Sequence, residues 1–212
     1  MSTIKLFYSP GACSLASHIL LRESGTSFEP LKIAFKSPEL LALNPKLRVP
    51  VLLTADGETI TETPAIFTYI AQLAPEKQLL GKTNLEVVRT YEWLNWLSGT
   101  LHGQAFGGLL RPERYTDDQS VYPAVKEKGL SNVRDCFAKI EDRLHSVYAV
   151  GDGLTVADVL LYVFYRWGFA LGEDMRVSYP RYTKLALNVA ERTSVKESIA
   201  AEGIDELIVP KL

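Results

Sequence analysis

The chain has 212 residues, of which 47% are hydrophobic, so it can bury a substantial core in one large domain or two small ones. Its formal net charge is −2, without a block of like charge, which argues against nucleic-acid partners and gives no support for binding at a membrane surface. Two cysteines make no disulfide framework, and neither a signal peptide nor a membrane span is visible, so we expect a soluble, cytoplasmic protein.

The first quarter of the chain alternates short strands and helices. An apolar alternation predicts a strand over 4–8, followed by a helix that closes at Gly25. A second apolar segment spans 28–33, and a short helix covers 39–43. That helix is expected to stop at Asn44, because the residue before a proline is pushed out of helical dihedrals.

A hairpin and another helix follow. Strands over 49–53 and 58–60 flank an Asp-Gly pair, which is typical of a hairpin turn. Thr63 is predicted to cap the next helix, with Pro64 at its first position and Pro75 ending it. The resulting order of elements suits one small α/β layer.

The pattern changes after a mostly polar segment at 76–84, where we place a domain boundary between 1–80 and 85–212. Beyond it the apolar periodicity is helical only. The three helical runs span 85–101, 133–147 and 156–167. A Thr-x-x-Asp pattern at 155–158 predicts a capping box at the start of the last run, which is a device of stability and not of chemistry.

One cysteine lies where a thiolate is chemically useful. Cys13 follows the first strand and a Pro-Gly turn, at the start of a helix whose positive end would lower the pKa of a thiol. Burial as a small apolar side chain is the competing interpretation. Ala16 stands three residues later, so there is no C-x-x-C dithiol motif. Cys136, on an apolar helical stripe, is interpreted as part of the core.

The histidines give no sign of a metal centre. They are scattered along the chain without acidic or cysteine companions at ligand spacing, at positions His18, His102 and His145. We therefore predict that the protein binds no metal.

Four features occur together in one order. They are Ser9-Pro10-Gly11-Ala12-Cys13-Ser14, Asn44-Pro45 leading to Val49-Pro50-Val51, Glu62-Thr63 opening a helix, and an all-helical second half with its Thr155-x-x-Asp158 cap. In this set the chain resembles the cytosolic glutathione transferases. The cysteine in the first turn, with Tyr8, Asn95 and His102, is most similar to the bacterial beta class.

The resemblance implies a fold and a function. The fold is α/β plus all-α: an N-terminal thioredoxin-like domain that binds glutathione, then a C-terminal helical domain that contributes the acceptor site. The activity is a detoxifying transfer of glutathione, as co-substrate, to small apolar electrophiles. A homodimer is also implied. The alternatives are thiol transfer or deglutathionylation through Cys13, and glutathione binding without turnover.

The resemblance also implies the glutathione contacts. Val49 offers its backbone to the cysteinyl part of glutathione, and the bond to Pro50 is cis. Glu62 and Thr63 grip the γ-glutamyl end, while Lys36 reaches the glycine carboxylate. A carboxylate such as that of Glu62 suits an ammonium partner.

Catalysis is assigned by the same resemblance to the surroundings of the sulfur. Donors from Cys13, Ser14 and Tyr8 hold glutathione as a thiolate, or Cys13 itself forms a mixed disulfide with glutathione; both mechanisms stay open. His102 is placed near the sulfur, and Asn95 near the glutathione. Seven residues make about two helical turns, so these two side chains are expected to face the same cleft.

The acceptor pocket is expected where the two halves of the chain meet. Its available apolar walls are Phe106, Leu110, Tyr115 and Trp167, although their spacing also fits ordinary core packing.

Overall fold

A four-stranded mixed sheet forms the N-terminal part of the computed structural model, which describes residues 3–206. Its strands, in the spatial order β2-β1-β3-β4, are β1 (Ile4–Tyr8), β2 (Phe28–Lys32), β3 (Val51–Leu53) and β4 (Thr59–Thr61). β1 runs parallel to β2, whereas β3 is antiparallel to both β1 and β4. The predicted strands and the hairpin are thus confirmed.

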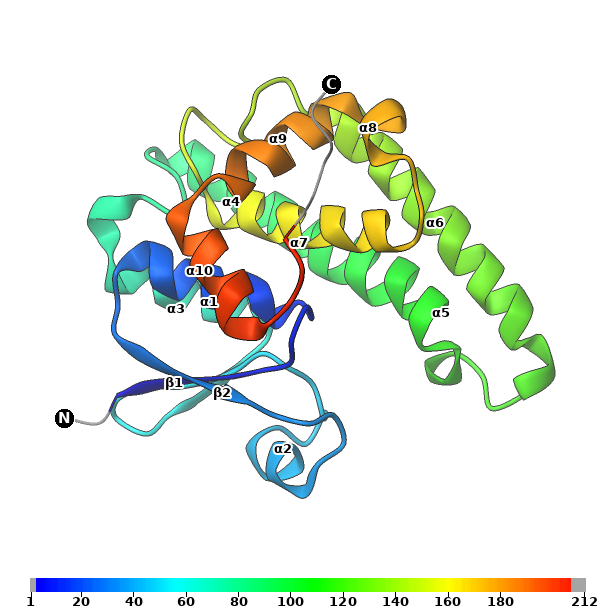
Figure 1. Ribbon diagram of the computed structural model, residues 1–212, viewed down its shortest axis with the longest axis horizontal. Helices are drawn as coiled ribbons and strands as arrows, with labels where there is room; N and C mark the ends of the chain where they lie inside the picture. The colour runs from blue at the N-terminus through cyan, green and yellow to red at the C-terminus, as the bar shows by residue number, and fades with distance from the viewer. Residues whose placement is uncertain (1–2, 207–212) are drawn as a thin grey trace.

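Helices cover both faces of this sheet (Figure 1). They are α1 (Ser14–Ser24), α2 (Pro38–Leu43), α3 (Thr63–Leu73) and the 3₁₀ turn η1 (Pro75–Lys77). α1 and α3 lie on one face and α2 on the other. Gly25 ends α1 with a φ of 74°, a left-handed conformation that glycine adopts without a steric penalty, as its position predicted.

The start of α3 differs from the prediction. Glu62, with a φ of 71°, is the N-cap residue, and Thr63 is already the first helical residue. The chain reverses at Glu62 directly after β4, so helical dihedrals begin one position earlier than the Thr-Pro pair indicated. The prediction that Thr63 caps the helix is therefore wrong.

The rest of the described chain is helical, as the change in periodicity predicted. Its elements are α4 (Asn84–Trp96), η2 (Leu97–Phe106), α5 (Gly107–Leu110), η3 (Pro112–Arg114), η4 (Gln119–Val121), α6 (Tyr122–Arg143), α7 (Val156–Ala170), α8 (Met175–Ser178), α9 (Pro180–Ala190) and α10 (Thr193–Glu202). The helix expected over 133–147 ends sooner, at Arg143. The capping box of Thr155 and Asp158 is confirmed.

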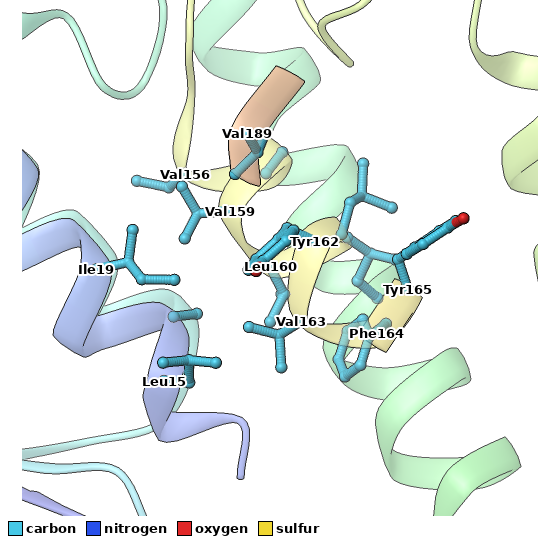
Figure 2. Close-up of a cluster of buried hydrophobic side chains, with 14 of the residues drawn as sticks. Leu15, Ile19, Val156, Val159, Leu160, Tyr162, Val163, Phe164, Tyr165 and Val189 are labelled. Atoms are coloured by element: carbon cyan, nitrogen blue, oxygen red, sulfur yellow. The ribbon is translucent and has the colours of Figure 1, made fainter. Parts of the chain in front are cut away.

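Helix α7 is the centre of the core and joins the two halves of the chain. Figure 2 shows Leu15 and Ile19 of α1 facing the apolar side of α7, which carries Val159 and Val163. All four side chains are completely buried. Full burial of one such side chain contributes about 1.5–3 kcal/mol, so this contact fixes the start of α1 relative to the helical half.

No helix in the described part of the chain is long and apolar enough to cross a membrane.

Candidate functional site

The loop between β1 and α1 is a tight turn fastened by its own residues. Ser9 and Ser14 bind each other across it: the amide of Ser9 donates to Ser14 Oγ, and Ser14 Oγ donates to the carbonyl of Ser9, each at 3.2 Å. Gly11 takes a φ of 68° at the turn. Cys13 follows as the N-cap residue of α1. The local geometry therefore places the cysteine at a helix N-terminus, as predicted.

The thiol of Cys13 is directed at the segment before β3. Its Sγ donates a hydrogen bond to the carbonyl oxygen of Val49 at 3.3 Å. The side chain is 6% exposed, and the bond between Val49 and Pro50 is cis, as expected. The cysteine and the Val-Pro segment are thus in direct contact.

The pKa of Cys13 differs from the prediction. Burial raises the pKa of this thiol to about 12, against the lowering effects of nearby backbone N–H groups and of the Arg48 charge. The helix N-terminus does act in the predicted direction, but desolvation of the thiolate is the larger effect. The expectation of a lowered pKa is therefore wrong for the ligand-free protein, and Cys13 is a protonated donor at neutral pH.

Glu62 carries the acidic group of the site. Its exposed carboxylate accepts a hydrogen bond from Lys46 Nζ at 2.5 Å, and the same ammonium donates to Thr61 Oγ1 at 3.1 Å. Thr63 lies beside it, nearly buried. Sequence reasoning did not single out Lys46. An ion pair this exposed is weak, worth about 0–1 kcal/mol, so another ammonium can take the place of Lys46.

His102 lies on η2, in contact with α7. Its ring centroid is 5.5 Å from that of Phe164 and 5.4 Å from that of Trp167. Burial, assisted by the charges of Arg48 and Arg114, lowers the pKa of His102 to about 4. The imidazole is therefore neutral at physiological pH.

The same two charged side chains act on His102 and on Cys13. Arg48 and Glu62 each influence the pKa of both side chains. The structure thus brings the predicted cysteine, histidine and glutamate into one electrostatic environment. Arg48 itself was missed by sequence reasoning, although it immediately precedes the Val-Pro pair.

The helix between Asn95 and His102 is not a regular α-helix. α4 ends at Trp96 and continues as a π-helix, η2, in which the amide of Gly107 donates to the carbonyl of His102, five residues earlier. A π-helix turns less per residue than an α-helix, so seven residues no longer make two whole turns. Asn95 is exposed, whereas His102 is half-buried. The helical periodicity on which the expected shared face rested is thus interrupted between the two residues, and their facing one cleft stays a prediction.

Two residues from the helical half hold the cysteine loop at Gly11. Trp167 Nε1 donates to the carbonyl of Gly11 at 2.9 Å, and the amide of Gly11 donates to Glu202 Oε2 at 2.9 Å. The other carboxylate oxygen of Glu202 lies 3.0 Å from Nδ1 of His18, with both side chains fully buried. Neither Glu202 nor His18 was predicted, because their partners are distant in sequence.

Tyr8 and Lys36 lie at the margins of this arrangement. Tyr8 packs on His18, with ring centroids 5.3 Å apart, and burial together with the charge of Glu202 raises the pKa of its phenol. Lys36 is exposed in the loop after β2, with a φ of 61°. Neither side chain makes a hydrogen bond to Cys13 within residues 3–206.

The predicted pocket walls occupy three different environments. Phe106, 2% exposed, packs in the core against Trp167, with ring centroids 5.0 Å apart. Leu110 and Tyr115 are exposed, and the hydroxyl of Tyr115 donates to the carbonyl of Gly103 at 2.7 Å. Trp167 is the one of the four that contacts both the cysteine loop and His102.

Over residues 3–206, no group of three or more histidine, cysteine, aspartate or glutamate side chains is arranged to hold a metal ion.

Comparison with known families and proteins identifies the two halves of the chain. Residues 2–72 match the model of the glutathione S-transferase N-terminal domain, and residues 101–193 match that of its C-terminal domain. Glutathione S-transferase GstA of Escherichia coli O157:H7 is 36% identical over 208 residues, which is 95% of this chain and 100% of the relative.

Solved structures agree with this match. A Sulfitobacter glutathione transferase homologue with bound glutathione has a TM-score of 0.90 at 28% identity, over 96% of this chain and 100% of its own. A beta-class glutathione S-transferase of Sphingomonas chungbukensis has a TM-score of 0.83 at 33% identity, over 95% and 100%. The expected thioredoxin-like domain followed by a helical domain is confirmed. The chain belongs to the glutathione S-transferase family, and its resemblance to the bacterial beta class is borne out.

Proposed function

We propose that this protein transfers glutathione to small apolar electrophiles, with residues 1–80 binding the tripeptide and residues 85–212 supplying most of the acceptor site. Family membership supports the reaction, and glutathione is bound in the solved Sulfitobacter structure and in a sphingomonad glutathione S-transferase that is 35% identical to this chain. The observation that carries the proposal is the 3.3 Å contact between Cys13 Sγ and the Val49 carbonyl, since it joins the sulfur donor to a backbone segment that can pair with a peptide.

The tripeptide is held at both ends. The backbone of Val49, shaped by Pro50, pairs with the cysteinyl part of glutathione. Glu62, with Thr63 beside it, binds the ammonium of the γ-glutamyl end, which replaces the ammonium of Lys46 as its ion-pair partner. Lys36, exposed on the loop after β2, reaches the glycine carboxylate.

Cys13 acts as a hydrogen-bond donor to the bound sulfur. When the backbone of glutathione pairs with that of Val49, the Val49 carbonyl oxygen no longer accepts from the Cys13 thiol. The thiol then donates its hydrogen bond to the glutathione sulfur. The glutathione thiol gives its proton to solvent, and its sulfur attacks the electrophilic carbon. In an aryl halide the displaced electron pair leaves with the halide, and in an epoxide or unsaturated carbonyl it goes to the acceptor, which takes up a proton from solvent. Ser14, Tyr8 and the N–H groups at the start of α1 add further stabilisation of the thiolate.

The raised pKa of Cys13 favours this role over a covalent one. A mixed disulfide requires the Cys13 thiolate as nucleophile, and burial disfavours that thiolate. Thiol transfer through Cys13 is therefore the secondary activity in this account.

Neutral His102 lies beside the reacting sulfur as a polar group without charge, and Trp167 connects it to the cysteine loop. Phe106 supports Trp167 from the core, while Leu110 and Tyr115 border the acceptor. Asn95 contributes to glutathione binding from the exposed end of α4.

The biological setting follows from the same assignment: a cytoplasmic, detoxifying homodimer. Exposed apolar side chains on neighbouring helices support pairing of two copies, namely Leu73 on α3 and Leu85 and Val88 on α4. Sedimentation velocity tests the dimer, and a single species of monomer mass would contradict it.

Glutathione-dependent turnover over a panel of aryl halides, epoxides and unsaturated carbonyls tests the activity. The proposal requires at least one acceptor whose conjugation needs both the protein and glutathione. Absence of turnover over the whole panel, with glutathione binding intact, would favour a non-catalytic role.

A further inference from the structure

Three arginines beside the site have no partner that neutralises them. Arg48 precedes the Val-Pro pair, while Arg111 precedes the η3 turn of the helical half and Arg114 is its last residue. Within residues 3–206, none of the three forms an ion pair with a carboxylate. Five other arginines of the described chain do form such ion pairs, whereas the exposed guanidinium groups of Arg111 and Arg114 are available to an anionic ligand.

The segment that carries two of these arginines is held in place. The amide of Arg111 donates to the carbonyl of Gly107 at 2.8 Å, and its guanidinium carbon lies 6.0 Å from the ring centroid of Phe35, in the loop after β2. The Tyr115 hydroxyl binds the carbonyls of Gly103 and Gln104 at 2.7 and 3.1 Å. Arg111 thus reaches from the helical half to the loop after β2, nine residues beyond His102, and Arg114 follows three residues later.

Their charges act on one another and on the site. Burial is the largest cause of the lowered pKa of Arg114, and Arg48 and Arg111 lower it further; Arg48 and Arg114 likewise add to the effect of burial on the pKa of His102. Glu113 and Tyr115 oppose the effect at Arg114, and Glu62 opposes it at His102, but Glu62 is already paired with Lys46. Repulsion among the guanidinium groups would be relieved by an anion between them.

We propose that Arg111 and Arg114 form an anion-binding subsite of the acceptor pocket, so that the preferred electrophiles carry a carboxylate. The inference rests on the proposed transferase function and names its substrate class. A guanidinium matches a carboxylate in shape and binds it with two parallel hydrogen bonds. Half-exposed Phe35 offers an apolar surface for the body of such an acceptor.

Glutathione has carboxylates of its own, and Arg111 contacts Phe35 beside Lys36, the residue assigned to the glycine carboxylate, so the variants below have to separate the two sources. The contacts proposed for the tripeptide backbone and its γ-glutamyl end all lie within the first 63 residues, whereas both arginines belong to the helical half. Arg48 acts on Cys13 as well as on His102, so we assign it to the glutathione side and leave it out of the subsite.

A matched pair of acceptors tests the subsite: 4-chloro-3,5-dinitrobenzoate and its neutral methyl ester. In both, the glutathione sulfur forms a bond to the chlorine-bearing carbon, chloride leaves with the electron pair, and the thiol proton passes to solvent. The ester also activates the ring more strongly than the carboxylate does, so the change in the ratio of the two kcat/KM values between variants, and not the ratio itself, reports on anion recognition.

The variants are Arg111→Gln, Arg114→Gln and the charge-conserving Arg114→Lys, with Arg89→Gln on α4 as the control. We expect each Gln variant to lose about tenfold in kcat/KM for the carboxylate, with a much smaller change for the ester. Arg114→Lys should keep most of the preference, the KM for glutathione should stay constant, and added salt should reduce the preference.

Equal losses for both acceptors, or a rise confined to the KM for glutathione, would overturn the subsite; the second result would assign the arginines to the carboxylates of glutathione. If the unmodified protein turns over neither acceptor, the wider electrophile panel decides the proposed function, and calorimetry with the two preformed conjugates decides the subsite. Tighter binding of the carboxylate conjugate that is lost in Arg114→Gln would uphold the subsite, and equal binding of both conjugates would refute it.

Discussion

The thiol of Cys13 and the carbonyl oxygen of Val49 are joined by a 3.3 Å hydrogen bond between segments 36 residues apart. This contact ties the start of α1 to the backbone that precedes β3. It also gives the cysteine the role of a donor, since burial raises the pKa of its thiol to about 12. The chemistry proposed for the site follows from that donor role.

In the ligand-free protein, Cys13 is expected to react slowly with iodoacetamide. Because its pKa is about 12, alkylation at pH 8 should be at least about 100-fold slower than that of an exposed thiol, and the rate should still rise above pH 9. Mass spectrometry of peptides separates it from Cys136, whose pKa burial also raises. A rate that levels off near pH 7 would show a stabilised thiolate and contradict the donor role.

Replacing Cys13 by alanine should affect the two possible activities differently. Conjugation should fall about tenfold, because a thiol is a weaker donor than the N–H groups whose removal costs about 100-fold or more. Thiol transfer from a mixed disulfide should disappear. Cys136→Ala, which changes the other buried thiol, is the matched control and should leave both rates unaltered. Loss of all conjugation with unchanged glutathione affinity would instead assign Cys13 an essential covalent step.

His102 should make the folded protein less stable toward acid. Its folded-state pKa of about 4 lies below the usual 6.5, so the unfolded chain takes up a proton first as the pH falls. The contribution is complete above pH 6.5 and is lost as the pH falls toward 4. In denaturant titrations, the free energy of unfolding of the unmodified protein should therefore fall between pH 6.5 and pH 4 by at least about 1 kcal/mol more than that of His102→Gln. Parallel curves would mean that His102 titrates normally.

Trp167→Phe should loosen the cysteine loop. The substitution keeps most of the ring contacts but removes the hydrogen bond to the Gly11 carbonyl, so the free energy of unfolding should fall by about 1 kcal/mol. Conjugation should slow, since the same loop carries Cys13. Trp96→Phe, at a half-buried indole that packs on Trp93, is the control. Equal effects of the two substitutions would show that Gly11 needs no donor from α7.

Local sequence patterns predicted most of the fold. Alternation marked β1, glycine marked the end of α1, and the Thr155–Asp158 pair marked the start of α7, because each depends on residues close together in the chain. Residue order also located Cys13 at its helix N-terminus. These are short-range effects that a sequence displays directly.

The remaining features depend on tertiary packing. The depth at which Cys13 is buried, which reverses the direction of its pKa shift, is set by segments that fold over it. The partners of Gly11 lie 156 and 191 residues away, at Trp167 and Glu202, and no local pattern connects them. The π-helix after α4 changed the relation between Asn95 and His102, and ordinary helical periodicity does not reveal such a change.

Titration calorimetry with glutathione tests the central claim most directly, namely that the site formed by Cys13, Val49 and Glu62 binds this tripeptide. The account predicts saturable binding at one site per chain, weakened about tenfold in Glu62→Gln and unchanged in Glu58→Gln, an exposed glutamate of the neighbouring hairpin turn. Absence of any heat of binding at millimolar glutathione, with the protein shown to be folded, would contradict it.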